Sequence, residues 1–335
     1  MYLAPMKNSD RPWEVHESEF PSEGIIEEQA KFLIRYAILA PSSHNSQPWE
    51  FDVEDEKLHV YADESEWLEV ADADKRELYF SVGCALENLL VAADRFGLGA
   101  TVDYFEGTSK VAEVTLGKDT PSSYPSGLFR AITERRTNHK VYHEGRIEED
   151  VLDSLERTFE KDDIELLKIT DGEEKEKITE LQTRADEKQF DDPEYRKELG
   201  RWIGSGALGA NWLMARVGQL AVTHLDLGES EGKKNSELLK SAPVVAFVST
   251  STDDREARVR AGQAFERLFL SATSEGIAVH PMNQILQVRE LKEELTNLLS
   301  PADTNLQLMF RLGYAPPEDE RRPRKPVESV LRKPE

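Results

Sequence analysis

The sequence predicts an α+β protein whose two halves resemble each other. Segments with helical periodicity alternate with short strand-like segments along the chain of 335 residues. Long apolar helices are predicted at 76–96 and 259–275, and their stretches 83–97 and 262–276 align without a gap, each beginning and ending on glycine. This repetition indicates an internal duplication. The alternative is that two unrelated core helices rich in small residues align equally well.

The first half is predicted to span residues 23–117, after a polar N-terminal arm at 1–22 that we expect to pack loosely. Apolar residues at helical spacing predict a helix at 23–39, which Pro41 ends. Strand patterns predict two hairpins, at 49–53 with 57–62 and at 101–105 with 111–116. The Pro- and Ser-rich stretch 118–126 predicts a linker.

The second half is predicted to span residues 127–335. Besides its long helix, it has helical patterns at 128–134, 148–160 and 173–189, and strand patterns at 164–169, 244–249 and 306–314. The same types of element therefore recur in both halves, with additional helical sequence in the second.

Acidic residues dominate the composition and exclude several kinds of partner. The chain has 65 Asp and Glu against 42 Lys and Arg, a net charge of −23. Nucleic acid and anionic membranes require cationic surface, so neither is an expected partner. Carboxylates dispersed in this way keep a protein hydrated in high salt, which suggests a halophilic host. The alternative is a moderately acidic protein from a mesophile.

Nothing in the sequence indicates export, a metal site or a disulfide. The first residues lack the pattern of a signal peptide, and no apolar run approaches the ~20 residues of a membrane span, so we expect a cytoplasmic protein. Cys84 is the single cysteine, and its place in an apolar helix predicts an inert packing residue. His139 and His143 lack a third ligand, so no metal site is expected.

Two sequence blocks carry a family resemblance. The loop 41–49, PSSHNSQPW, resembles the PS-x-x-N-x-QPW loop of the nitroreductase flavoenzymes, and 135–142, RRTNHKVY, resembles their R-R-[ST]-x-[RK] block. In an ordinary nitroreductase the Arg block comes first, and two identical subunits each lend one block to a shared pocket. The swapped order here implies a nitroreductase-like fold in which two diverged halves are fused and mimic the homodimer.

A further segment resembles one branch of this superfamily. Residues 184–202 are similar to the A-D…D-P-x-Y-x-x-E-L-x-x-W segment of the Acg-like branch, whose members share the chain length and the swapped blocks. The resemblance implies one FMN between the halves, a monomer sufficient for the flavin site, and a lid formed by 184–212, which is absent from short nitroreductases.

The resemblance assigns two basic clusters to the FMN phosphate. The first comprises Arg135, Arg136, Thr137 and His139, with His139 standing where the family has Lys or Arg; the second comprises Arg322 and Arg324 near the C-terminus. Arginine forks pair with phosphate oxygens, whereas a histidine is only partly charged near neutral pH. The alternative for each cluster alone is a solvated surface patch.

Polar residues in two other segments are assigned to the flavin ring. Hydroxyl and amide groups on the first loop are expected to bond ring and ribityl atoms, and a turn after the second long helix is expected to contribute backbone N–H groups. The assigned residues are Ser42, Ser43, Asn45 and Gln47 on the loop, and Pro281, Asn283 and Gln284 on the turn. His44 and His280 flank this pocket.

The resulting functional hypothesis is an FMN-dependent oxidoreductase. NAD(P)H would reduce the flavin, which would then reduce a small-molecule acceptor such as a nitroaromatic or a quinone, so no catalytic dyad is required of the protein. The sequence 204–209 matches G-x-G-x-x-G but follows a helical pattern instead of a strand, which argues against a dinucleotide loop. The alternatives are a protein that sequesters FMN with little turnover, or a structural relic without flavin.

Overall fold

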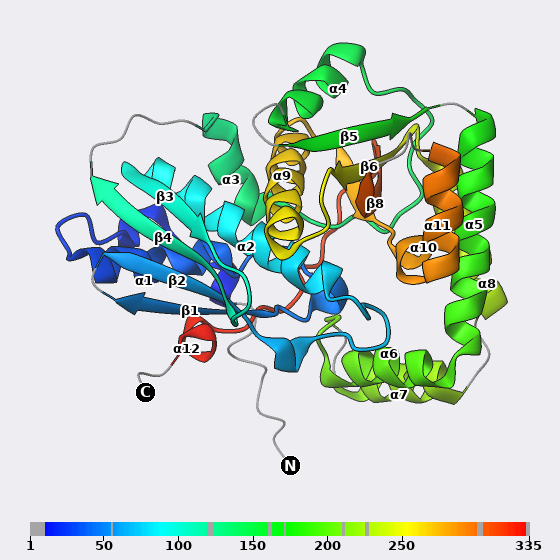
Figure 1. Cartoon of the computed structure of the whole chain (residues 1–335), viewed down its shortest axis with the longest axis horizontal. Coiled ribbons are helices and arrows are strands. Elements are labelled where there is room, and N and C mark those ends of the chain that lie inside the picture. Colours follow the sequence, from blue (N-terminus) through cyan, green and yellow to red (C-terminus); the bar gives the residue numbers. More distant parts are fainter. Residues whose placement is uncertain are drawn as a thin grey trace.

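Two antiparallel sheets stand on either side of two long central helices (Figure 1). The computed structural model describes residues 11–54, 56–118, 124–159, 163–170, 172–209, 212–224, 228–299 and 304–332. The central helices are α2 (Arg76–Arg95) and α9 (Arg255–Ser274). Both are predicted by the sequence, and their packing joins the two lobes.

The first sheet has the strand order β1-β2-β4-β3. Its elements are α1 (Ile26–Ala37), β1 (Trp49–Glu54), β2 (Lys57–Ala62), β3 (Leu98–Tyr104) and β4 (Lys110–Lys118). Both predicted hairpins are confirmed, with Glu54 opposite Lys57 at the first turn.

The second sheet has the order β5-β6-β8-β7 and therefore the same connectivity as the first. Its elements are α3 (Ser126–Glu134), α4 (Glu149–Glu156), β5 (Ile164–Ile169), β6 (Val244–Thr250), β7 (Ala278–Pro281) and β8 (Asn305–Gly313). In both lobes two strands precede the long helix and two follow it, and the last two exchange places in the sheet. The short strand β7 is not predicted by the sequence.

Further helices lie between the strands of the second lobe. They are α5 (Gly172–Asp191), α6 (Pro193–Ser205), α7 (Trp212–His224), α8 (Gly228–Ser241), α10 (Gln284–Gln287) and α11 (Arg289–Leu299); α12 (Val327–Val330) follows near the C-terminus. Single 3-10 turns occur at Arg11–Trp13, Glu17–Glu19, Ser43–Asn45, Glu64–Glu66 and Arg157–Phe159.

Helices cover both faces of the second sheet, which explains the unbroken apolar run of β6. Val244, Ala246 and Val248 face the main core beneath α9. Val245 and Phe247 face a second core formed with α5, α8, α10 and α11. A strand buried on both faces reads as continuously hydrophobic.

The two long helices cross in contact at a pair of glycines. A Cβ atom added at Gly83 would lie 2.0 Å from the carbonyl oxygen of Val259, and one added at Gly262 would lie 2.0 Å from that of Phe80. Each obstructing carbonyl comes three residues before the opposite glycine, so the contact is reciprocal. Backbones approach this closely only where both residues lack a side chain.

The N-terminal arm does not pack loosely throughout. Residues 1–10 lie outside the described part of the chain, but Trp13 is only 4% exposed. Its indole Nε1 donates a hydrogen bond to the carbonyl of Arg322 at 2.9 Å. The expectation of a loosely packed arm is wrong at Trp13. Its indole packs against basic residues near the C-terminus, and nothing in the sequence around Trp13 indicates these partners.

No helix within the described ranges is long and apolar enough to cross a membrane. Within the same ranges, no group of three or more His, Cys, Asp and Glu side chains is placed to hold a metal ion.

Candidate active site

A cavity of about 630 Å³ lies where the two lobes meet, within the size range of ligand pockets. The first lobe contributes the loop 41–45 and one face of α2, and the second contributes 135–140, the turn 280–287 and the segment 318–324. Predicted site residues in its wall are Ser42, Ser43, Asn45, Arg135, Arg136, Thr137, His139, Pro281, Asn283, Gln284, Arg322 and Arg324. The fold thus gathers predicted residues that lie nearly 300 positions apart in the sequence.

Gln47 is the predicted site residue that does not line the cavity. Its side-chain Oε1 accepts a hydrogen bond from the backbone N–H of Lys325 at 2.7 Å, and its Nε2 donates to the carbonyl of Asn45 at 3.2 Å. Both ends of the amide are therefore bonded within the protein. Gln47 holds the loop against the C-terminal segment, which corrects its assignment to the flavin ring.

The loop from Ser42 to Gln47 has an unusual backbone. His44, Asn45 and Gln47 have φ angles of 50°, 55° and 53°, in the left-handed region that non-glycine residues seldom adopt. Each such residue costs about 1–2 kcal/mol. The loop is held by Asn45, whose Nδ2 donates to the carbonyls of Ala207 at 2.7 Å and Pro323 at 2.9 Å. Surrounding contacts thus impose a conformation that the sequence alone disfavours.

Arginines gather around Trp13 at one end of the cavity. The guanidinium carbons of Arg136, Arg321 and Arg324 lie 4.9, 5.5 and 4.8 Å from the centroid of its ring. These are cation–π distances. Trp13 was not among the predicted site residues, since one tryptophan near the N-terminus carries no local sign of such a partner.

Arg324 is 5% exposed, and its guanidinium is held by protein oxygens. It donates to Asn45 Oδ1 at 2.8 Å and to the carbonyls of Leu39 and Ala40, both at 3.1 Å. Its Nε has no hydrogen-bond partner among the described residues. Burial, together with the positive charge of Arg135, holds the pKa of Arg324 well below its ordinary value.

Arg135 is equally buried, at 3% exposure. It donates to the carbonyl of Leu39 at 3.0 Å, and its Nε lies 3.5 Å from Glu266 Oε1 without forming a hydrogen bond. Burial raises the pKa of Glu266 to about 8, so this carboxyl offers little compensating charge at neutral pH. Burial, followed by the charges of Arg321 and Arg135, lowers the pKa of Arg136 to about 10.

Arg135, Arg136, Arg322 and Arg324 are therefore gathered in the cavity wall, where Glu318, Asp319 and Glu320 also lie. In a chain of net charge −23, buried arginines that lower one another's pKa favour an anionic ligand. A dianionic phosphate would accept charge-assisted hydrogen bonds from Arg135, Arg136 and Arg324 and remove the repulsion. The residues present fit a phosphate at this end.

His139 is an exposed residue of the cavity wall. Partial desolvation of its ring, followed by the charge of Arg322, lowers its pKa below its ordinary value. It packs edge-on against His280 with ring centroids 4.4 Å apart. The Nδ1 of His280 in turn accepts a hydrogen bond from Arg311 Nε at 3.1 Å. The assignment of His139 to the FMN phosphate stays a prediction.

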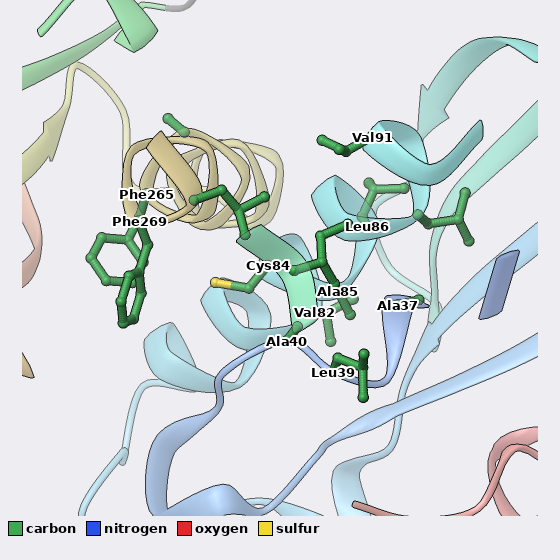
Figure 2. Packing of buried hydrophobic residues seen from close by; sticks show 14 of the residues in the cluster. Ala37, Leu39, Ala40, Val82, Cys84, Ala85, Leu86, Val91, Phe265 and Phe269 are labelled. Carbon is green, nitrogen blue, oxygen red and sulfur yellow. The ribbon is translucent and has the colours of Figure 1, made fainter. Parts of the chain in front are cut away.

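Apolar rings and one buried carboxylate also line the cavity. Phe80, Cys84 and Phe265 line it from the central helices. Figure 2 shows the Cys84 thiol extending from α2 on the side where Phe265 and Phe269 extend from α9. Burial raises the pKa of this thiol well above its ordinary value, which agrees with an inert cysteine.

Glu77 supplies the carboxylate, and it was not among the predicted site residues. Its Oε1 accepts hydrogen bonds from Gln287 Nε2 at 2.8 Å and Arg76 Nη2 at 3.1 Å, and its Oε2 accepts one from the Ser43 hydroxyl. An acidic residue in the first turn of a helix is ordinary in sequence. Glu77 reaches the cavity only because of how α2 packs in the fold.

The turn after α9 differs in detail from its prediction. Asn283 Oδ1 accepts a hydrogen bond from the N–H of Met309 at 3.0 Å, so its side chain serves the turn itself. The buried Oε1 of Gln284 has no partner in the part of the chain that the structure describes. Gln284 therefore offers a side-chain group to a ligand in addition to the predicted backbone groups.

Segment 184–212 contributes to the cavity wall. Tyr195 of α6 and Leu208 line it, and the carbonyl of Leu208 accepts a hydrogen bond from Arg322 Nη1. Glu198 anchors α6 to the first lobe by accepting hydrogen bonds from the backbone N–H groups of Val70 at 3.1 Å and Ala71 at 3.0 Å. The described part of this segment thus bridges both lobes beside the cavity.

Comparison with known proteins identifies the family of the chain. The sequence matches the Nitroreductase family over residues 133–314, and the chain belongs to that family. It is 26% identical over 298 residues to the Mycobacterium tuberculosis protein named "Putative NAD(P)H nitroreductase Rv3131", covering 86% of each chain. It is 24% identical over 324 residues to the M. tuberculosis protein named "Putative NAD(P)H nitroreductase acg", covering 93% of this chain and 97% of that one.

Among solved structures, it is similar to the FMN-dependent nitroreductase NfnB from Mycobacterium smegmatis in complex with NADPH. The two are 17% identical, with a TM-score of 0.45, over 62% of this chain and 98% of that one. It is also similar to a nitroreductase with bound FMN from Bacteroides fragilis, at 20% identity and a TM-score of 0.38, over 59% of this chain and 95% of that one.

Proposed function

We propose that the cavity binds one FMN and that the protein is an NAD(P)H-dependent oxidoreductase. The observation that carries the proposal is the pair of buried arginines, Arg135 and Arg324, beside a cavity of about 630 Å³. Their Nε groups have no hydrogen-bond partner among the residues that the structure describes. A phosphate suits that end, and the apolar and amide-lined opposite end suits an aromatic ring system. Membership of the nitroreductase family supports the same cofactor.

In this proposal each end of the cavity has a separate task. Arg135, Arg136, Thr137, Arg322 and Arg324 hold the phosphate, and the burial of Arg135 and Arg324 excludes water from the bonds they make. Ser42, the Gln284 amide and the backbone of the turn orient the ring. FMN supplies the hydride chemistry, so the protein's residues bind the ring, orient it and set its surroundings.

NAD(P)H is the proposed electron donor, and a nitroaromatic or quinone the proposed acceptor. The names of the M. tuberculosis relatives support this assignment. Stopped-flow mixing of the FMN-loaded protein with NADH and with NADPH tests it. Bleaching of the flavin absorbance within seconds supports an oxidoreductase, and an unchanged oxidised spectrum with both donors refutes it.

We further propose that residues 23–117 and 127–335 are diverged copies that rebuild a dimeric pocket within one chain. The matching strand orders and the reciprocal contact at Gly83 and Gly262 support this. One monomer should then suffice for FMN binding. Light scattering of the FMN-loaded protein tests this, since an obligate dimer that loses FMN on dilution would contradict it.

The second candidate function is flavin storage. It is favoured by the contacts of segment 184–212, where Tyr195 and Leu208 line the cavity and the carbonyl of Ala207 is bonded to Asn45. A segment held in this way covers part of the cavity and could keep nicotinamide out. The stopped-flow experiment separates the two functions. A cytoplasmic location and a halophilic host stay predictions from the sequence.

A further inference from the structure

His44 occupies a position in the cavity that FMN binding leaves unexplained. It lies in the middle of the loop Ser42–Ser46 and lines the cavity beside Glu77 and Tyr195. Its Nδ1 is buried and has no hydrogen-bond partner within the described residues. A buried ring nitrogen without a partner costs about 1–3 kcal/mol, so this nitrogen lowers the stability of the folded protein.

The backbone fixes where this imidazole stands. His44 has φ 50° and ψ 20°, and hydrogen bonds at 3.0 Å from the N–H of Asn45 to the carbonyl of Ser42 and from that of Ser46 to Ser43 close the turn around it. Only residues tolerant of the left-handed region fit here, and among residues with side chains Asn is the most tolerant. The histidine is therefore held in place by a strained turn and not by bonds to its ring.

Charges on two neighbouring elements act on the imidazole. Burial lowers the pKa of His44 below its ordinary value, while the carboxylates of Glu77 on α2 and Glu198 on α6 partly offset this. Other charged or titratable groups facing the loop include Arg76, which is paired with Glu77, Tyr195 of α6, and Arg324, which is bonded to Asn45. Glu66 and Asp72 line a small pocket with Ser43 and Ser46, and burial raises the pKa of Asp72 to about 8.

Three other polar side chains of the cavity wall are less suited to giving up a proton. Burial raises the pKa of the Cys84 thiol and of the Tyr195 hydroxyl well above their ordinary values. The Glu77 carboxylate already accepts three hydrogen bonds. His44 has a buried ring nitrogen without a partner within the described residues, and burial lowers its pKa, which makes its protonated form a stronger acid.

We propose that His44 is the proton donor to the acceptor reduced in the cavity, with Glu77 stabilising its protonated form. This rests on the proposed oxidoreductase function. With a quinone as acceptor, bound reduced FMN would supply the hydride and be oxidised, and the quinone would be left with one oxyanion. The imidazolium N–H bond breaks and its proton goes to the oxyanion formed, giving a hydroquinone; water reprotonates the imidazole.

The test isolates this step from the nicotinamide reaction. The FMN-loaded protein is reduced by light under anaerobic conditions and mixed with 1,4-benzoquinone in a stopped-flow instrument between pH 5 and 8. His44→Asn keeps the left-handed backbone but cannot donate an acidic proton. The wild-type rate of flavin reoxidation should rise as pH falls through the His44 pKa, and His44→Asn should lose that rise and be about 10²-fold slower at pH 5.

Glu77→Gln provides the matched variant. Removing the negative charge lowers the His44 pKa further, so the acidic limb of the profile should move to lower pH without disappearing. Nuclear magnetic resonance of ¹³C-labelled histidine, in protein without flavin, should show the same displacement of the His44 titration. The His44 titration can be measured even if NAD(P)H does not reduce the protein or if FMN does not bind.

Two results would overturn the proposal. One is an acidic limb in His44→Asn that equals that of the wild type, with rates within threefold. The other is a His44 titration that does not move in Glu77→Gln. Failure of FMN to bind would instead refute the proposed function, and the two failures are thus distinguishable.

Discussion

A methyl group added at Gly83 should force the two central helices apart. In Gly83→Ala the new Cβ would stand 2.0 Å from the Val259 carbonyl oxygen and 2.9 Å from its carbon. Both obstructing atoms are backbone, so no side-chain rotation relieves the clash. Overpacking of this kind costs about 3 kcal/mol, of which the better helix propensity of alanine returns about 1 kcal/mol.

The net loss of about 2 kcal/mol should lower the Tm by about 3 °C in a chain of 335 residues. Differential scanning calorimetry measures this change. Gly262→Ala should give the same loss, because its Cβ meets the Phe80 carbonyl at the same 2.0 Å. The double variant should lose less than the sum, since the first methyl group already separates the helices.

Gly127→Ala is the matched control. It also lies in a helix, α3, but its Cβ would be 3.4 Å from the nearest atom, a Ser274 side-chain carbon, which is ordinary contact. It should leave the Tm unchanged or slightly raised. If Gly83→Ala proved as harmless as this control, the close contact between the two halves would not exist as described.

Three further variants test other parts of the account. Arg324→Ala should raise the FMN dissociation constant by one to two decades, since a charge-assisted hydrogen bond contributes about 1.5–3 kcal/mol. The control is Arg289→Ala at an exposed site, which should leave the dissociation constant unchanged in the same titration at fixed salt. Trp13→Ala should also weaken FMN binding, by roughly tenfold, because Arg324 loses the ring beneath it, as a fluorescence titration would show. Burial raises the pKa of Asp186 to about 6, so the free energy of unfolding of the wild type should fall as pH rises from ~4 to ~6 and stay lower above it. Asp186→Asn should flatten that part of a urea-unfolding pH profile. An unchanged slope in the variant would contradict the burial effect.

The sequence predicted the long helices and most strands because their patterns are local. Apolar residues at helical spacing marked α2 and α9, and the run 244–249 marked β6. Their spatial relation was not predictable in the same way. Nothing in the repeat itself shows that Gly83 and Gly262 face each other, because that contact depends on how two distant helices cross.

The candidate site shows the same difference between local patterns, which were predictable, and contacts between distant segments, which were not. The two motif blocks identified two parts of the wall, since a loop and a basic cluster are each contiguous in sequence. Trp13, Glu77 and Tyr195 were missed because each is a single residue that reaches the cavity only through the fold. Gln47 was placed in the site by its motif, although its amide bonds to the C-terminal segment.

The burial of Arg76 could not be predicted from the sequence. A charged residue at the start of a helix is expected to face solvent, yet Arg76 is 1% exposed and donates to the Gln307 carbonyl and to Glu77. Removing it would disturb the cavity wall. Comparisons of FMN affinity therefore require a truly exposed arginine such as Arg289 as the control.

The most direct test of the account is the cofactor content of the purified protein. We predict a flavin absorbance spectrum, release of FMN on denaturation, and one FMN per monomer after reconstitution. Chromatography of the released cofactor and light scattering of the loaded protein give these values. Release of FAD, or a colourless protein that takes up no FMN, would contradict the assignment of the cavity between the two halves.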